Sequence, residues 1–391
     1  MPRTSPVGML RILTGTSALT LTAGLAHGAA LEQAVPSTLR LLYEEGTYAE
    51  FGITYTDPDQ SGEDATIPAG VVGPAAVTLP GNTGDLFEDR WNFSAAWKND
   101  INEQLSYVVL FDQPFIADTK YGQGSFLPNP INFTYDDSSA DLTTYQITGV
   151  LAYDVNPNVK VYGGVRAQWL NADAALPFIA GYSVDADPDW GYGWLVGAAY
   201  ARPEIGLRVG LTYFSEIDHD LDTSEFSDFF GAADTNTDIN TPQSVTLDAQ
   251  TGIAEGTLVF GSIRWVDWSE FAIEPPLYGQ TTQAFLGFER PLVAYADDWW
   301  TYNLGVGRQL TDTLAGSLSV TYEPDVGGEL TSLGPYDGRT TGTAALSYDY
   351  GQINVTGGLT YGMLGDTFNL LNTDYNDGSV WGAGVRVGYT F

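Results

Sequence analysis

Fourteen segments of this chain alternate apolar and polar residues, and the connections between them alternate between long and short. In the last segment, apolar or aromatic side chains stand at every second position from Trp381 to Phe391, with small or polar residues between them. Successive side chains of a β-strand point to opposite faces, so a period of two gives a strand one apolar and one polar face. Strands are predicted near residues 40–56, 89–99, 103–115, 141–154, 158–171, 189–201, 205–217, 242–251, 255–271, 299–309, 313–324, 338–349, 352–363 and 380–391.

The order of the connections distinguishes a membrane barrel from a soluble β-sandwich. The odd-numbered connections are long and rich in Asp, Gly, Pro and Ser, whereas the even-numbered ones are tight turns such as 155–157 and 350–351. Barrels of bacterial outer membranes have short periplasmic turns and long outer loops, and a sandwich has no reason to sort its loops in this way. The sequence therefore predicts an all-β fold: a transmembrane antiparallel β-barrel of about 14 strands over residues 40–391.

Aromatic residues gather near the predicted strand ends. In a barrel such residues form girdles at the two membrane surfaces, although packing in a core is the alternative. The residues concerned are Trp190, Tyr192, Trp194, Trp265, Trp268, Phe271, Trp299, Trp300 and Tyr302.

The first thirty residues are predicted to be a cleaved export signal. Arg3 and Arg11 give a positive start, residues 12–26 are apolar and small, and residues 28–30 offer small side chains for cleavage. No later stretch approaches the eighteen or so apolar residues that a spanning helix needs. The expected location is the bacterial outer membrane, with residues 31–39 left as a short N-terminal segment inside the barrel.

Charge and composition exclude several functions. The chain has 15 Lys+Arg against 49 Asp+Glu, a net charge of −34, so nucleic acid is not an expected partner. It has no Cys, and the two His residues are His27, in the signal, and His219, which has no neighbouring pattern that suggests an enzyme. Acidic loops such as 234–238 lack the Gly and Glu that complete a calcium loop. We therefore predict no enzymatic activity, no cofactor and no metal site.

Five segments, in this order and spacing, resemble the FadL/TodX family of outer-membrane transporters for long-chain fatty acids and other hydrophobic compounds. The segments are 112–115, 156–159, 190–194 running into 197–200, 241–245, and 265–271 with its Trp-Ser-x-Phe ending. The resemblance implies a monomeric barrel of fourteen strands with a plug in its lumen. It also implies capture of cargo between outer loops and sideways release where the third strand kinks inward.

The resemblance is incomplete at the N-terminus. The family's longer hatch and its Asn-Pro-Ala motif are absent here, so the plug is expected to be reduced or supplied by loops that fold inward. Asp112 and Pro114 in the third predicted strand would weaken its pairing. Pro114 is equally consistent with a kink and with a simple strand end.

Two sets of residues are candidates for ligand binding. Exposed apolar clusters in loops mark binding or mutual burial, and those of the third and fourth outer loops are Leu176, Phe178, Ile179, Phe226, Phe229 and Phe230. The second set consists of arginines that the alternation places in the lumen: Arg166, Arg208, Arg264 and Arg386. An arginine of this set can bind a ligand carboxylate through two hydrogen bonds or pair with lumen acids such as Glu50 and Asp267.

The function predicted from these observations is passive transport of hydrophobic molecules across the outer membrane. Long-chain fatty acids are the expected cargo, with aromatic hydrocarbons as the other hydrophobic class, and outer-membrane lipid surrounds a monomeric barrel. A general porin for small polar solutes and a surface-binding or structural barrel are the alternatives.

Overall fold

A computed structural model describes residues 31–33, 38–67, 69–70, 73–129, 133–327, 329–334 and 336–391. Fourteen antiparallel strands form a closed barrel, because the first strand pairs with the second on one side and with the last on the other. The predicted signal at 1–30 lies outside the described residues. The barrel strands are β1 (Tyr48–Asp59), β4 (Arg90–Asp100), β5 (Leu105–Asp112), β7 (Ser139–Asn156), β8 (Val159–Leu176), β10 (Asp189–Arg202), β11 (Leu207–Phe214), β14 (Ser244–Ala254), β15 (Thr257–Val266), β18 (Trp299–Gln309), β19 (Leu314–Glu323), β21 (Arg339–Tyr350), β22 (Ile353–Leu364) and β25 (Ser379–Thr390).

The predicted fold is confirmed, and several strand boundaries differ from the prediction, of which three bear on the interior of the barrel. The first strand begins at Tyr48 rather than near residue 40, because Thr38–Leu41 form a short helix, α2, whose side chains are buried. The third strand ends at Asp112, and the ninth ends at Val266, since Trp268 turns away from the wall and is fully buried. No helix in the described part of the chain is long and apolar enough to cross a membrane.

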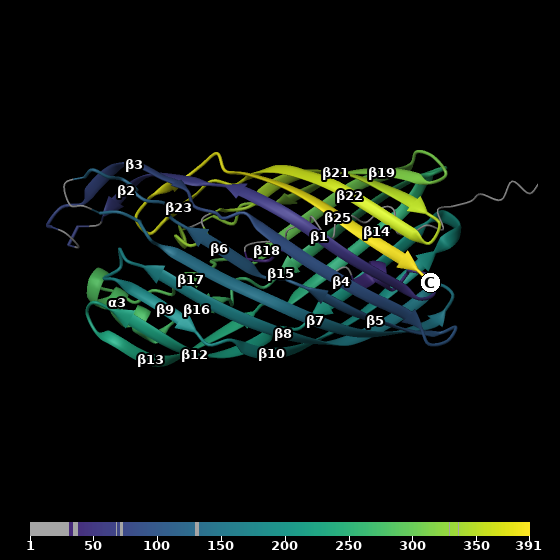
Figure 1. Cartoon of the computed structure of the whole chain (residues 1–391), viewed down its shortest axis with the longest axis horizontal. Coiled ribbons are helices and arrows are strands. Elements are labelled where there is room, and N and C mark those ends of the chain that lie inside the picture. The colour runs from purple at the N-terminus through teal and green to yellow at the C-terminus, as the bar shows by residue number, and fades with distance from the viewer. Residues whose placement is uncertain are drawn as a thin grey trace, which may run out of the picture.

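The long connections gather at one end of the barrel and the turns at the other, as Figure 1 shows. The C-terminus lies at the end with the turns, opposite the hairpin of β12 (Ile217–Ser227) and β13 (Gly231–Thr241). A second sheet above the barrel joins the first, sixth and seventh outer loops. Its strands are β2 (Ser61–Ile67), β3 (Val77–Asp85), β20 (Glu329–Leu330), β23 (Thr367–Asn369) and β24 (Asp374–Tyr375).

The remaining elements of the outer loops lie against the same end of the barrel. They are β6 (Ile116–Lys120), β9 (Tyr182–Ala186), β16 (Ala272–Ile273), the helix α3 (Pro276–Leu286) and β17 (Val293–Ala294). The fifth outer loop, which contains β16, α3 and β17, is called the lid below. Its helix begins and ends with residues that are common at helix ends. Pro276 lies in the first turn, and Gly287 follows the last turn with a left-handed φ of 92°.

The two faces of the wall differ as the alternation predicted. Outward residues such as Leu318, Leu346 and Leu359 are exposed, while the inward neighbours Ser317 and Thr360 are buried. The aromatic residues near the strand ends fall into two groups. Trp190, Tyr192, Trp194, Trp300 and Tyr302 face outward. By contrast, Trp268, Phe271 and Trp299 are buried, because they belong to a hydrophobic cluster that the lid forms with the strands and loops packed against it.

Residues 38–44 fill the lumen toward the end with the turns. Leu39, Leu41 and Leu42 pack against inward side chains of β4, β5, β7 and β8. A Cβ on Gly210 of β11 would come too close to the Cδ2 of Leu39, so a larger residue there would require the Leu39 side chain to shift. The guanidinium of Arg40 binds both Glu44 and Glu50, so a buried ionic network also joins this segment to β1.

Candidate functional site

A cavity lined mainly by apolar side chains lies inside the barrel, below the lid. We call it the apolar pocket. Its volume is about 50 Å³, smaller than the roughly 150 Å³ of an engineered apolar cavity that holds benzene. Its lining comprises Leu31, Ala117, Ala140, Asp141, Leu142, Ala172, Asp173, Ala174, Val184, Ala186, Leu221, Thr223, Thr237, Ile239, Ile273, Pro275, Leu292, Val293, Thr331 and Leu333.

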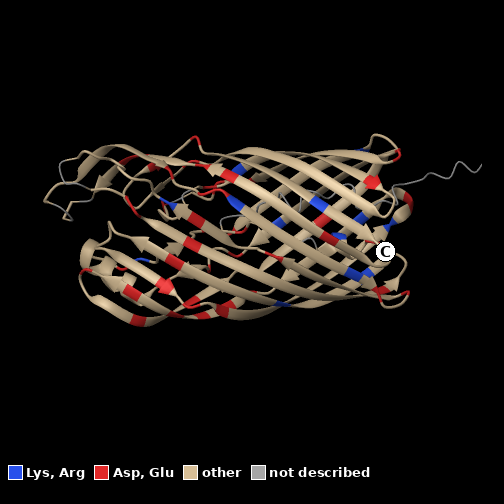
Figure 2. Cartoon of the chain, in the orientation of Figure 1, with Lys and Arg blue, Asp and Glu red and all other residues tan. Residues whose placement is uncertain are grey.

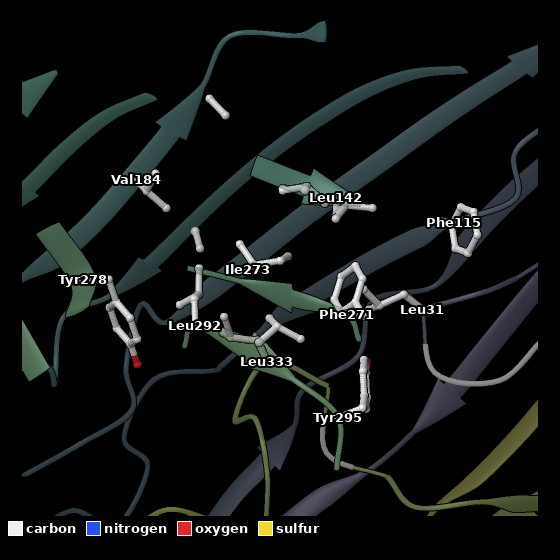
Figure 3. Packing of buried hydrophobic residues seen from close by; sticks show 14 of the residues in the cluster. Leu31, Phe115, Leu142, Val184, Phe271, Ile273, Tyr278, Leu292, Tyr295 and Leu333 are labelled. Carbon is white, nitrogen blue, oxygen red and sulfur yellow. The ribbon is translucent and has the colours of Figure 1, made fainter. Parts of the chain in front are cut away.

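Segments far apart in the sequence build this pocket. Small and aliphatic residues of β7 and β8 form the wall, the inward face of the β12–β13 hairpin forms a second side, and the lid forms the cover. Leu31 of the N-terminal segment reaches the same cavity. In Figure 3 the side chains of Leu31, Ile273, Leu292 and Leu333 lie close together in this region. Alternate inward residues of strands therefore supply the wall, and loops supply the cover.

Aromatic rings extend the apolar surface from the pocket toward the third strand. Trp268 lies 5.0 Å from Phe271 and 6.1 Å from Phe115, measured between ring centroids, with edge-to-face geometry in both pairs. Tyr295 is 5.1 Å from Trp268. Burial raises the pKa of Tyr278 and that of Tyr295, so both phenols stay neutral and the cluster carries no charge at physiological pH.

One buried carboxylate holds the lid over the pocket. Glu225 of β12 accepts hydrogen bonds from the backbone N–H groups of Leu277 and Tyr278, at 3.1 and 3.0 Å, in the first turn of α3. It also accepts from the hydroxyls of Tyr182, at 2.7 Å, and Thr235, at 2.5 Å. The first N–H groups of a helix have no partner inside the helix, and Glu225 accepts hydrogen bonds from two of them. Its negative charge also interacts favourably with the positive end of the helix dipole. Three outer loops thereby meet at one side chain.

The lid is also fastened on its other side. The guanidinium of Arg290 forms two hydrogen bonds with the carboxylate of Glu329 in the sixth loop, at 2.6 and 3.1 Å. The Thr331 hydroxyl donates to the carbonyl of Leu292 at 3.1 Å. These links are polar and partly exposed, so they can break without opening the buried core.

The wall of the barrel is interrupted beside the pocket. The pairing of β4 with β5 stops at Ala95 opposite Phe111, and β4 residues 90–94 have no ladder partner on that side among the described residues. The third strand resumes as β6 at Ile116, with three residues, 113–115, opposite two of β7. The Gln113 side chain spans the interruption, since its Oε1 accepts from the backbone N–H of Phe93 at 2.8 Å.

The N-terminal segment occupies the inner side of this interruption. The backbone N–H of Gln33 donates to the carbonyl of Pro114 at 2.7 Å, and that of Ile116 donates to Leu31 at 3.1 Å. Glu32 stands opposite Phe115 in an antiparallel bridge. The stretch around Pro114 therefore pairs inward with residues 31–33 rather than sideways with β4.

The four predicted arginines all point inward, and each contacts other parts of the chain. Arg264 binds Glu32 through two hydrogen bonds, at 2.9 and 2.5 Å. Arg166 donates to Gln146 and to the carbonyl of Ser215, both at 2.9 Å. Arg208 donates to Gln250 at 2.7 Å and lies over the Tyr43 ring, while Arg386 lies 3.8 Å from Glu50. Arg264 thus anchors the N-terminal segment, and Arg208 and Arg386 surround it.

The predicted loop residues fall into two groups. Leu176 and Ile179 are buried in the cluster beneath the lid, and the Phe178 ring packs edge-on against Tyr135 at 4.8 Å. Phe226, Phe229 and Phe230 are 42%, 51% and 51% exposed, at the tip of the β12–β13 hairpin. The Phe229 ring lies beside the rings of Phe230 and of Phe285 in α3, with ring centroids 6.4 and 6.3 Å apart. The first group packs the loops together, and the second forms an exposed aromatic patch.

Comparison with known proteins identifies the family. The family model for outer membrane transport proteins described as OMPP1/FadL/TodX matches residues 14–326. The chain belongs to this family. It is therefore an outer-membrane transport channel rather than an enzyme, as the sequence predicted. A search of curated proteins finds no match.

Solved structures of FadL/TodX-type channels share the fold. A Pseudomonas aeruginosa FadL homologue aligns with a TM-score of 0.72 at 14% identity, over 94% of this chain and 97% of that one. The Pseudomonas putida toluene transporter TodX aligns with a TM-score of 0.62 at 14% identity, over 95% and 98%. The Ralstonia pickettii toluene transporter TbuX aligns with a TM-score of 0.61 at 15% identity, over 94% of this chain and 97% of that one.

Sequence reasoning missed the lid and its fastening. Pro276 and Gly287 bracket an eleven-residue helix, and this pattern is a recognised signal for helix ends. The strand pattern on either side made the segment look like an ordinary outer loop. Nothing in the local sequence marks Glu225 or Glu32, because the lid N–H groups that bind Glu225 and the arginine that binds Glu32 lie far along the chain.

Proposed function

We propose that this channel carries hydrophobic small molecules, with long-chain fatty acids as the expected cargo, and releases them sideways into the membrane. The observation that carries the proposal is the apolar pocket inside the barrel, next to an interruption of the wall. The toluene transporters among the structural neighbours make aromatic hydrocarbons the second cargo class to test.

Capture is assigned to the exposed patch of Phe226, Phe229 and Phe230. Large exposed apolar side chains on an otherwise acidic loop mark a contact site for an apolar partner. The patch reaches the lid through Phe229 and Phe285. A molecule bound there is therefore next to the element that covers the pocket.

Binding in the pocket is assigned to burial of apolar area. At roughly 25 cal/mol per Å², an alkyl chain that buries about 300 Å² gains roughly 7 kcal/mol. The cavity of about 50 Å³ is too small for such a chain, so the lid has to move when cargo enters. Leu176, Phe178 and Ile179 support the cover in this proposal. Arg166 is the predicted arginine that we assign to a polar group of the cargo, because it donates to Gln146, which in turn donates to Asp112 at the edge of the interruption.

Release is assigned to the interruption between β4 and residues 112–117. The opposite exit, along the barrel axis, is occupied by residues 38–44 and the Arg40–Glu50 network. We propose that residues 31–39 act as the hatch and move away from Pro114 and Ile116 when cargo passes. The packed lumen also argues against a general porin, which needs an open aqueous channel.

The proposal is tested by uptake of labelled oleate, labelled toluene and a small sugar, in cells that lack their own hydrophobic transporters and express this chain. Import of oleate or toluene without the sugar supports the proposal. Sugar entry alone would replace it with a porin function. A correctly inserted barrel that imports none of the three would replace it with a surface-binding role.

A further inference from the structure

A wide groove crosses the outward face of the barrel wall, on strands that take no part in the apolar pocket. We call it the wall groove. It runs mainly over β18, β19, β21, β22, β25 and β1, which pair with one another in this order and can be followed in Figure 1. Its volume is about 1110 Å³, against about 50 Å³ for the apolar pocket, so it has room for a much larger molecule.

The hollow of the wall groove comes from small residues placed among leucines. On the outward face, Gly316 and Gly357 stand on either side of Leu346, and Ala344 stands beside Leu359 in the neighbouring row. A Cβ at Gly357 would lie no closer than 3.9 Å to any residue other than its chain neighbours, so that position is open. The small residues therefore leave gaps between larger side chains, and the gaps join across the strands.

The groove rises from the turn end of the barrel toward the middle of the membrane. Arg308 is one residue from the turn end of β18, whereas Val385, in the same row of paired residues, is five residues from the end of β25. From β18 to β1 the row crosses five strand intervals of about 4.8 Å, or roughly 24 Å. An acyl chain of one leaflet spans about half of the roughly 30 Å hydrocarbon core, so the groove is long enough to hold one.

The end of the groove at the turns is polar. Thr257 of β15 stands opposite Arg308, and both residues line the groove. The other outward residues of the lining are glycine, aliphatic or aromatic. The groove therefore matches an amphipathic lipid, with a cation near the membrane surface and apolar side chains deeper in the membrane.

Arg308 differs from the other charged residues of this wall because it is exposed on the outward face. In β18, β19, β21, β22 and β25, all of which the structure describes in full, the others alternate to the inward face. They are Glu323, Arg339, Asp349 and Arg386. Within the described part of the chain, no ion pair joins Arg308 to Glu255 or Asp312, the acids of the two nearest turns. Its charge is thus available to an anion from outside the chain.

We propose that the wall groove binds one anionic phospholipid of the periplasmic leaflet, with its phosphate on Arg308 and one acyl chain along the groove. Arginine binds phosphate through two parallel hydrogen bonds, and the short turns of outer-membrane barrels lie at the periplasmic surface. This lipid is a specific ligand, in addition to the bulk lipid around the barrel. A second copy of the chain fits less well, because a symmetric contact through this face would offer Arg308 no carboxylate.

The test is native mass spectrometry of the folded barrel in a non-ionic detergent, titrated with phosphatidylglycerol or phosphatidylcholine of identical acyl chains. Wild type should retain one phosphatidylglycerol and bind it roughly tenfold more tightly than the zwitterionic lipid, the effect of one charged hydrogen-bonded contact. Arg308→Gln should remove this preference, and Arg308→Lys should keep part of it. Gly357→Leu, which fills the groove, should weaken binding of both lipids.

Two substitutions elsewhere on the wall are matched controls. Arg202→Gln removes an exposed arginine at the turn end of β10 that does not line the wall groove. Gly149→Leu adds the same side chain as Gly357→Leu, at an outward glycine of β7 that also has open space around it. Neither control should change lipid binding, and heat-modified gel mobility checks that each barrel folds.

Three results would overturn the lipid site. Unchanged preference in Arg308→Gln, or an equal loss in Arg202→Gln, would mean that no phosphate is held at Arg308. Equal weakening by Gly149→Leu and Gly357→Leu would mean that the acyl chain does not lie in the groove. Dimers that form without lipid and dissociate in Gly357→Leu would assign the groove to a second copy of the chain.

Discussion

At the scale of single residues, the lid depends on Glu225 more than on its own helix. An eleven-residue helix is marginal by itself, and the first N–H groups of α3 find their acceptor in another loop. Glu225→Ala should cost about 1–2 kcal/mol locally, comparable with loss of a helix cap, and speed amide exchange in α3 roughly tenfold. Hydrogen exchange measured by mass spectrometry checks this. Glu225→Gln, which keeps one acceptor, should lie between, and unchanged protection in Glu225→Ala would show that the lid is held elsewhere.

The exposed and the packed phenylalanines should respond differently to substitution. Replacing Phe229 and Phe230 by Asp adds charge to side chains that are already half exposed, so the fold should persist while uptake of hydrophobic cargo falls severalfold. Phe178→Ala removes ring contacts with Tyr135 and Phe133 and should loosen the outer loops by about 2–4 kcal/mol. Uptake kinetics and limited proteolysis separate the two effects. Normal uptake by the double Asp variant would remove the patch from the transport route.

At the scale of elements, the interruption of the wall follows from a one-residue excess in the third strand. Three residues, 113–115, stand opposite two of β7, and Pro114 cannot donate a ladder hydrogen bond. Deleting Pro114 should leave two residues opposite the two of β7, so that β5 and β6 form one continuous strand beside β4. The barrel should still fold, and uptake should be abolished. Pro114→Ala keeps the count and should keep uptake. Full activity of the deletion variant would exclude the interruption as the exit.

The strands were predictable and the site was not, for a physical reason. The strands of a barrel wall can be recognised from a short stretch of sequence, because successive side chains face lipid and lumen in turn. Ser317 and Leu318 are an example. The lumen and the lid are held by contacts that join distant segments, such as Glu32 with Arg264 and Glu225 with Leu277. A local pattern can place Arg264 inside the barrel, but it cannot show that Arg264 already holds a carboxylate.

The shift of the first strand has the same origin. Residues 40–47 carry enough apolar side chains to resemble the start of a strand, yet Leu41 and Leu42 pack inside the lumen and Arg40 pairs across to Glu50. A single-sequence pattern cannot distinguish an apolar residue that faces lipid from one that fills the barrel.

At the scale of the whole molecule, negative charge dominates the outer end. Figure 2 shows acidic residues across the loops around β9, β12 and β13. Asp220 and Asp238 stand directly opposite each other on the hairpin. The exposed carboxylates of these loops are Asp185, Asp187, Glu216, Asp218, Asp220, Asp222, Asp228, Asp234 and Asp238. A chain with a net charge of −34 therefore repels an anionic cargo electrostatically, whereas a neutral cargo is not repelled.

This field predicts a salt dependence that separates the two cargo types. Raising the ionic strength from about 10 to 150 mM shortens the screening length from about 30 to 8 Å, which weakens repulsion at the loops far more than contacts inside the barrel. The association rate of laurate with the purified channel in an uncharged detergent should rise severalfold, while that of 1-dodecanol should stay constant. Stopped-flow fluorescence of the loop aromatics measures both rates. In a variant with Asp220 and Asp238 replaced by Asn, the association rate of laurate at low salt should already be raised. If the association rate of laurate with the unsubstituted channel instead falls as salt is added, attraction to buried arginines governs its approach rather than repulsion by the acidic loops.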